Sequence, residues 1–177
     1  FSGDFVGNGS STKTTTTLYY ARSNRYFEKT PIVSPSASAL FDAGSGPSIY
    51  ALAYDETIDK IFYVKSGVLK KANSDGTGAT SLVTGLGTCF AMTIDAVNEF
   101  VYVADYSNST LRKIKYDGST NTIIISGNRY LSVWIDLINN QLYIGNYGVG
   151  SVQRSNLDGS SLTTLVTGQS NIRGITY

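Results

Sequence analysis

The sequence predicts an all-β protein, a β-propeller of about four blades, each of them a four-stranded antiparallel sheet. Three observations carry this prediction: a repeat close to forty residues long, short segments rich in Val, Ile, Tyr and Thr, and the lack of any segment with helical periodicity. Four short strands repeated at this interval are typical of a propeller blade.

Three markers define the repeat. The first is an aspartate that ends an alternating, strand-like segment, and its copies lie 40 and 41 residues apart at Asp55, Asp95 and Asp136. The second is a tyrosine in the apolar strand that follows, at Tyr19, Tyr63, Tyr102 and Tyr143. The third is an Asp-Gly pair, at positions 75–76, 117–118 and 158–159. Asp-Gly between two strands indicates a hairpin turn, in which we expect both residues to have positive φ.

The marker spacing divides the chain into an arm and a propeller. Residues 1–16 are expected to form a flexible N-terminal arm, and residues 17–177 the propeller. The blades then cover 17–46 together with 171–177, 47–86, 87–128 and 129–170. The first blade begins at its second strand and residues 172–177 match a first strand, so we expect the C-terminal strand to complete the N-terminal blade. Two alternatives stay open: a neighbouring copy supplies that strand, or the chain is part of a larger ring.

The composition excludes several functional classes. The 177 residues include no histidine, which removes histidine-based catalysis and most zinc or iron sites. The single cysteine, Cys89, allows no disulfide within the chain, and its apolar surroundings predict a buried side chain. A formal net charge of +1 without a basic patch argues against nucleic-acid binding. No apolar run approaches about 18 residues, so we expect no membrane span.

The surface composition favours an extracellular or cell-surface protein. Charged residues are only 15 % of the chain, well below the usual share, and Thr, Ser, Gly, Asn and Tyr supply the polar surface instead. The chain begins at Phe1 without a signal peptide, so we expect a mature or trimmed product. Asn8 and Asn108 begin N-glycosylation sequons, and Asn108 falls in a loop after a blade's second strand, where a glycan would be accessible.

Two sets of residues are candidates for a functional site. Asp55, Asp95 and Asp136 recur at the ends of inner strands and could bind a cation such as Ca²⁺ at one mouth of the ring. Their repetition in each blade favours hydrogen bonds to their own turns instead, so we expect no metal and no cofactor. The second set is a predicted surface contact patch of Tyr and Asn side chains in or near loops, at Tyr106, Tyr116, Asn146 and Tyr147.

Two stretches resemble known propeller repeats. Residues 91–114 resemble an NHL repeat, with the sequence Ala-Met-Thr-Ile-Asp-Ala-Val-Asn-Glu-Phe-Val-Tyr-Val-Ala-Asp-Tyr-Ser-Asn-Ser-Thr-Leu-Arg-Lys-Ile. Residues 136–168 resemble the YWTD repeat of lipoprotein-receptor class B domains, with Leu-Tyr-Ile-Gly-Asn at 142–146. No copy keeps the whole tetrapeptide, and Tyr102-Val-Ala-Asp105 alone retains its final Asp. The resemblance covers residues 17–177 and implies a ligand-binding or scaffold propeller outside the cell, in a family whose rings usually have six blades.

These observations predict a non-catalytic extracellular propeller that binds protein partners or other copies of itself as a structural or scaffold subunit. A lectin-like propeller is the alternative, because loops with Tyr and Asn would form a shallow carbohydrate site in each blade. A histidine-free hydrolase or lyase is the third hypothesis, and it would need carboxylates at the central mouth. We therefore expect that the chain is not an enzyme.

Overall fold

The protein consists of β-strands joined by tight turns. The computed structural model describes residues 17–22, 26–31, 38–42, 49–170 and 172–175, and every regular element in these ranges is a strand. Within the same ranges there is no helix of a length and hydrophobicity that would cross a bilayer. The all-β prediction is therefore confirmed for the described part of the chain.

The strands form one three-stranded and three four-stranded antiparallel sheets, each in the order of the sequence. The first sheet contains β1 (Thr17–Arg22), β2 (Tyr26–Pro31) and β3 (Ser38–Asp42). The second contains β4 (Leu52–Asp55), β5 (Lys60–Lys65), β6 (Val68–Asn73) and β7 (Thr80–Val83). The third contains β8 (Cys89–Asp95), β9 (Phe100–Asp105), β10 (Thr110–Lys115) and β11 (Asn121–Ser126). The fourth contains β12 (Tyr130–Asp136), β13 (Gln141–Asn146), β14 (Ser151–Asn156) and β15 (Thr163–Val166).

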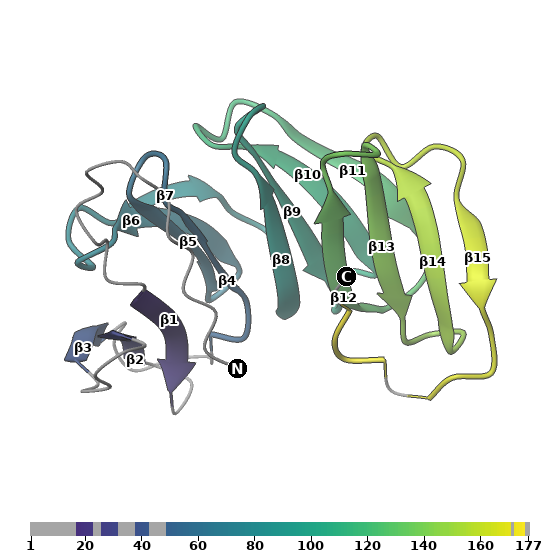
Figure 1. Ribbon diagram of the computed structural model, residues 1–177, viewed down its shortest axis with the longest axis horizontal. Coiled ribbons are helices and arrows are strands. Elements are labelled where there is room, and N and C mark those ends of the chain that lie inside the picture. The colour runs from purple at the N-terminus through teal and green to yellow at the C-terminus, as the bar shows by residue number, and fades with distance from the viewer. Residues whose placement is uncertain (1–16, 23–25, 32–37, 43–48, 171, 176–177) are drawn as a thin grey trace, which may run out of the picture.

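The three four-stranded sheets lie side by side as blades, with the first strand of each innermost. Strand β8 contacts both β4 and β12, and Figure 1 shows these three inner strands next to one another. Because successive side chains of a strand point to opposite faces, β9 contributes to the core on both of its sides. Val101 and Val103 pack toward β5, whereas Tyr102 and Ala104 pack toward β13. All four side chains are fully buried, so blade-to-blade packing forms the core.

The predicted closure through residues 172–177 is not formed in the described residues. The sheet of β1 has three strands, and residues 172–175 belong to no strand. Ile172 instead lies against the last blade, since a Cβ added to Gly145 of β13 would be 2.8 Å from the Cγ2 atom of Ile172. Figure 1 likewise places this segment near β12 rather than near β1. The structure thus shows three complete blades and one three-stranded sheet.

The Asp-Gly hairpins differ from the expected two-residue turns. Gly118 has positive φ (78°), but Asp117 does not, and the Gly118 N–H donates to the Lys115 carbonyl at 2.9 Å. The turn is therefore centred on Tyr116 and Asp117, and the glycine follows it in the left-handed conformation. The Asp117 carboxylate accepts hydrogen bonds from the backbone N–H and the hydroxyl of Ser119, at 2.9 and 2.6 Å. The prediction of positive φ at both residues was wrong, although the hairpins lie where it placed them.

These hairpin glycines also permit close contact between blades. A Cβ added to Gly118 would lie 2.5 Å from the carbonyl oxygen of Leu82 on β7. A Cβ added to Gly159, in the next blade, would lie 2.1 Å from the carbonyl oxygen of Ile124 on β11. Each hairpin therefore sits on the outermost strand of the preceding blade, at a distance that only glycine allows.

Candidate binding surface

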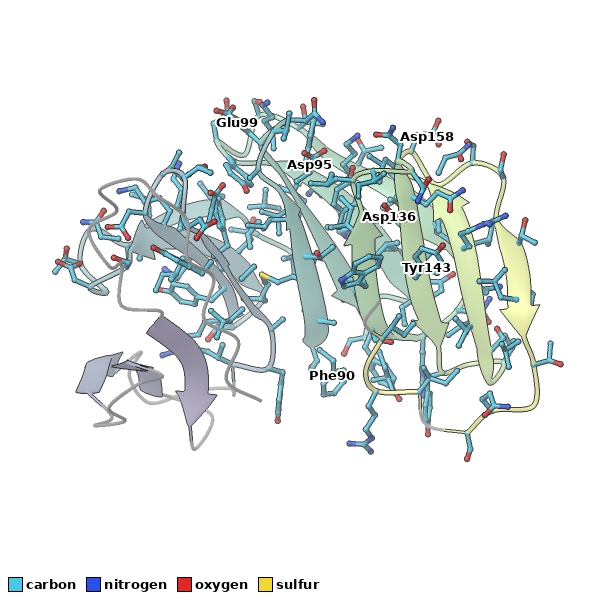
Figure 2. All side chains as sticks on the ribbon, viewed as in Figure 1. Phe90, Asp95, Glu99, Asp136, Tyr143 and Asp158 are labelled. Carbon is cyan, nitrogen blue, oxygen red and sulfur yellow. The ribbon has the colours of Figure 1, made fainter. Side chains whose placement is uncertain are left out.

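The antiparallel strands divide the blades' turns between two opposite edges. The turns after β4, β8 and β12 share one edge with the Asp-Gly hairpins, and we call it the carboxylate edge. The starts of β8 and β12 and the loops after β9 and β13 share the other, which we call the aromatic edge. Figure 2 shows Asp95, Glu99, Asp136 and Asp158 along one side of the molecule and Phe90 on the opposite side. The two edges therefore carry different chemistry.

The recurring aspartates of the carboxylate edge cap their own turns. Asp95 accepts hydrogen bonds from the backbone N–H and the side-chain amide of Asn98, at 2.9 and 2.8 Å. Asp136 accepts the same two bonds from Asn139, at 3.0 and 2.7 Å. The side-chain amide of Asn139, with its backbone N–H, holds the pKa of Asp136 below its usual value. Among the described residues, no three Asp, Glu or Cys side chains lie close enough together to share a metal ion.

Asp55 has an additional partner from the next blade. Its carboxylate accepts hydrogen bonds from the Thr57 N–H and hydroxyl, at 2.8 and 2.6 Å, and from the Tyr116 hydroxyl at 2.8 Å. Burial alone would raise the pKa of Asp55, but the hydrogen bonds from Thr57 and Tyr116 outweigh it and lower the pKa. The Tyr116 ring packs on Phe62 with centroids 4.3 Å apart. The hydrogen bond and the ring contact together connect two blades.

Tyr116 and Asn146 are therefore not part of the predicted surface patch. Tyr116 is only 5 % exposed, because the hairpin turn directs its ring into the preceding blade. Asn146 is 1 % exposed and donates to the side-chain oxygen of Gln153 at 3.0 Å, while its own oxygen accepts the Val149 N–H at 3.3 Å. Both residues have structural roles in turns, so their assignment to the surface was wrong.

Asp105 is a key polar residue that the sequence reasoning did not select. It is completely buried, and it accepts hydrogen bonds from the Gly87 N–H at 3.1 Å and the Asn108 side chain at 2.9 Å. The Arg112 Nε atom lies 3.7 Å from the same carboxylate. Asp105 thus connects the segment that enters β8 to the loop after β9. Asp105 is the final residue of the tetrapeptide Tyr102-Val-Ala-Asp105, which resembles the YWTD repeat, and this resemblance could have identified it.

Of the two predicted glycosylation sites, the structure describes Asn108 but not Asn8. Asn108 lies in the exposed loop between β9 and β10, where the sequence placed it. Its side-chain nitrogen donates to Asp105 and also to the Gly85 carbonyl, at 3.1 Å. Asn8, like the predicted arm 1–16, lies outside the described residues. Glycosylation of either asparagine stays a prediction.

The aromatic edge holds four rings in consecutive contact. Tyr50 and Phe90 have centroids 5.1 Å apart, Phe90 and Tyr106 meet edge to face at 5.2 Å, and Tyr106 and Tyr147 lie 5.8 Å apart. Aromatic rings prefer these tilted and edge-on arrangements at such distances. The rings come from three blades, and Tyr50 and Tyr147 are 48 % and 39 % exposed. The structure therefore brings together the predicted Tyr106 and Tyr147 and adds Tyr50 and Phe90.

Backbone hydrogen bonds fix the two loop tyrosines. The Tyr106 N–H donates to the Thr88 carbonyl at 3.0 Å, and the Tyr147 N–H donates to the Arg129 carbonyl at 2.8 Å. Each bond connects the loop after a blade's second strand to the segment that enters the same blade. The loop backbones that carry the two rings are thus fixed to the blades, which lowers the entropy lost when a ligand binds.

Two hollows flank Tyr147 and form what we call the aromatic groove. The first has a volume of about 320 Å³ and is lined by Phe90, Tyr106, Leu131, Tyr147 and Arg173. The second has a volume of about 360 Å³ and is lined by Ser109, Gly127, Asn128, Arg129, Tyr147 and Gly148. The Arg129 guanidinium lies 5.2 Å from the centre of the Tyr106 ring and donates to its hydroxyl at 3.4 Å. Each hollow thus combines the Tyr147 ring with one arginine side chain.

The comparisons with known proteins identify the fold. No family model and no curated protein matches the chain. A chain from the crystal structure of a nidogen/laminin complex is 17 % identical with a TM-score of 0.72, over 86 % of this chain and 61 % of that one. A protein of unknown function from Bacteroides thetaiotaomicron is 18 % identical with a TM-score of 0.65, over 81 % and 42 %. An auxiliary nutrient binding protein from the same organism is 14 % identical with a TM-score of 0.68, over 90 % and 40 %.

These similarities show that the chain has the fold of a β-propeller, which confirms the propeller architecture predicted from the repeat but not the number of four blades. The chain spans between 40 % and 61 % of the length of the three structures.

Proposed function

We propose that the chain is a non-catalytic binding module whose aromatic edge recognises a protein partner. The observation that carries this proposal is the contact of four rings from three blades, flanked by Arg129 and Arg173. Tyr and Arg are enriched among the residues that contribute most to protein–protein binding. A concave surface with rigid rings suits that role, because little side-chain freedom is lost on binding.

The polar chemistry of the described residues supports a role without catalysis. The aspartates of the carboxylate edge use their oxygens to cap turns, on the side of the blades opposite the groove. Cys89 is buried, and burial raises the pKa of its thiol, which disfavours the nucleophilic thiolate. The sequence offers no histidine as a general base for either group.

The neighbouring folds and the composition support the finer parts of the proposal. A nidogen/laminin complex and a nutrient binding protein are among the structures of similar fold. The low share of charged residues, 15 %, fits an extracellular or cell-surface location. The tetrapeptides that begin at Tyr102 and Tyr143 fit blades of the YWTD or NHL type.

A second observation favours assembly with a further blade. Tyr102, Leu111 and Ile125 face the next blade and are at most 7 % exposed, because β12–β15 covers them. At the equivalent place in the last blade, Val166 is 44 % exposed and Trp134 packs on Tyr143 with centroids 5.8 Å apart. We infer that a blade beyond those described covers this face, from the same protein or from a second copy. Intact mass together with light scattering of the native protein distinguishes the two sources, and a monomer without further blades would contradict the inference.

Carbohydrate is the alternative ligand of the aromatic edge. Sugar rings pack on tyrosine faces, and a hollow of about 320 Å³ has the size of a small-molecule site. A glycan array would show binding that depends on Tyr147 if this alternative holds.

The proposal is tested by selecting binders and mapping them. Displayed peptides and protein domains are selected on the wild-type chain and then measured against Tyr147→Ser and Phe90→Ser. We expect each substitution to weaken binding by about tenfold or more, as at an interface hot spot. Ile138→Ser is the matched control, because Ile138 is 92 % exposed at the carboxylate edge. Binders that survive both groove substitutions but are lost with Ile138→Ser would refute the proposal.

A further inference from the structure

We propose that the aromatic groove takes an acidic segment of the partner: an extended peptide that places an Asp or Glu beside an apolar side chain. This inference rests on the proposed function, since it names the chemistry of the ligand at the same surface. It follows from the charges in the groove, from how those charges are held, and from the shape of the two hollows.

Among the described residues, the groove carries positive charge that no neighbouring carboxylate balances. Arg173 lines the first hollow and Arg129 lines the second, whereas neither lining includes an Asp or a Glu. Within the described ranges, neither guanidinium is in an ion pair with a carboxylate. The net charge of the whole chain is only +1, so this local excess does not reflect a basic protein. A carboxylate of the partner would supply the missing counter-charge.

The carboxylate closest in sequence to the groove cannot take this role. Asp105 directly precedes Tyr106, but it is fully buried and faces Arg112. Its two oxygens already accept hydrogen bonds from Gly87 and Asn108. The aspartates that cap the blade turns lie on the opposite edge. These carboxylates of the described residues therefore do not neutralise the groove.

Arg129 is positioned before a ligand arrives. Its guanidinium stacks near the Tyr106 ring at 5.2 Å, and one of its nitrogens donates to the Tyr106 hydroxyl. Its carbonyl accepts the Tyr147 and Gly148 N–H groups at 2.8 and 3.3 Å, which fixes the backbone. Arginine has five donors in a planar fork, so donors remain for a carboxylate. Placing a charged fork in advance lowers the cost of binding that carboxylate.

The shape of the groove selects an extended segment. Tyr147 lines both hollows. In an extended chain the side chains at positions i and i+2 point to the same side, so one segment can fill both hollows. Phe90, Leu131 and Tyr147 give the first hollow an apolar wall, and the second is lined by small and polar residues around Arg129. The expected ligand therefore has an acidic residue two positions from an apolar one.

The experiment uses an array of twelve-residue peptides, in which every peptide with Asp or Glu has a twin with Asn or Gln. We expect the acidic peptides to be enriched among those bound by the wild-type protein, and their twins to bind about tenfold more weakly. Arg129→Gln and Arg173→Gln should each weaken the acidic peptides about three- to tenfold and reduce the effect of salt on binding. Arg154→Gln, on β14 and outside both hollows, is the matched control and should bind as the wild type does. Thermal unfolding of each variant verifies that its fold is retained.

Three results would overturn the inference, and they separate it from the proposed function. If bound peptides lose affinity with Tyr147→Ser but not with their amide twins or the arginine variants, the edge binds proteins but not through acidic groups. If uronate-containing oligosaccharides bind through the two arginines and no peptide does, the ligand is a carbohydrate. If no peptide or selected protein binds in a way that depends on Tyr147 or Phe90, the proposed function itself is wrong.

Discussion

The hydrogen bond between Tyr116 and Asp55 should contribute measurably to stability, and Tyr116→Phe isolates it. The substitution removes one hydroxyl and leaves the ring on Phe62, where the centroids are 4.3 Å apart. The donor and acceptor residues are 5 % and 2 % exposed, so water cannot replace the lost bond. A hydrogen bond to a charged group contributes about 1.5–3 kcal/mol. Because Thr57 still donates two bonds to Asp55, we expect a loss of about 1.5–2 kcal/mol in the free energy of unfolding.

The pH dependence gives this prediction its sign. The pKa of Asp55 is lower in the folded protein than its usual value of 3.8. A carboxyl group with a lowered pKa stabilises the fold above its unfolded pKa, and that stability is lost as the pH falls through the folded pKa. The difference in the free energy of unfolding between wild type and Tyr116→Phe should therefore reach its full value at pH 7 and decrease below about pH 4.

The assay is urea unfolding of both proteins at pH 7 and at pH 3, followed by circular dichroism. Tyr54→Phe is the matched control, because the Tyr54 hydroxyl also donates to an aspartate, Asp59, at 3.0 Å but in an exposed position. We expect it to cost no more than about 0.5 kcal/mol. Equal losses for the two variants, or a loss for Tyr116→Phe that does not change with pH, would refute the reasoning.

Three further predictions concern stability. Gly159→Ala should cost about 2–4 kcal/mol in urea unfolding, because φ is 84° and the new Cβ would meet the Ile124 carbonyl, whereas Gly168→Ala, with φ of 71° and open space, should cost only about 1 kcal/mol. Asp105→Asn should cost about 2 kcal/mol, since a buried acceptor of several bonds beside Arg112 loses its charge; a thermal midpoint equal to that of the wild type would contradict this role. The lowered pKa of Asp136 should make stability fall as the pH drops below about 4, and Asp136→Asn should flatten that part of the pH profile.

The elements that depend on local sequence could be predicted. Asp95 followed three residues later by Asn98 is a turn signal, and the structure contains the two hydrogen bonds that such a turn provides. The tyrosine strands were recognisable because Tyr102 lies among apolar, β-branched neighbours that favour a buried strand. The repeat then fixed the order of the sheets, since consecutive short strands with tight turns pair antiparallel.

The direction of a side chain next to a turn could not be predicted in the same way. Tyr116 and Tyr147 both lie just after a strand, yet one is 5 % and the other 39 % exposed. The hairpin of Tyr116 rests on the preceding blade, which covers the ring, whereas the loop of Tyr147 ends at the open edge. Asn146 differs from Tyr147 by one position and points inward because of the strand alternation. Contacts between neighbouring blades decide whether such a side chain is buried or exposed. These contacts cannot be predicted from the sequence of one repeat alone.

One repeat position at the aromatic edge carries a different side chain in each copy of the repeat. Tyr50, Phe90, Leu131 and Arg173 occupy one repeat position, at intervals of 40, 41 and 42 residues. Phe90 and Leu131 lie at the starts of β8 and β12, and Tyr50 lies just before β4. The turn aspartates five residues later keep their identity in the three copies that the chain contains, because each has the same hydrogen bonds to make. At the other position the side chain changes from blade to blade, so no hydrogen bond within the blade requires one particular residue there. Four different side chains therefore lie at the aromatic edge and make its surface differ from blade to blade. This contrast between constant and varied repeat positions supports the proposal that the binding surface lies on the aromatic edge rather than on the carboxylate edge.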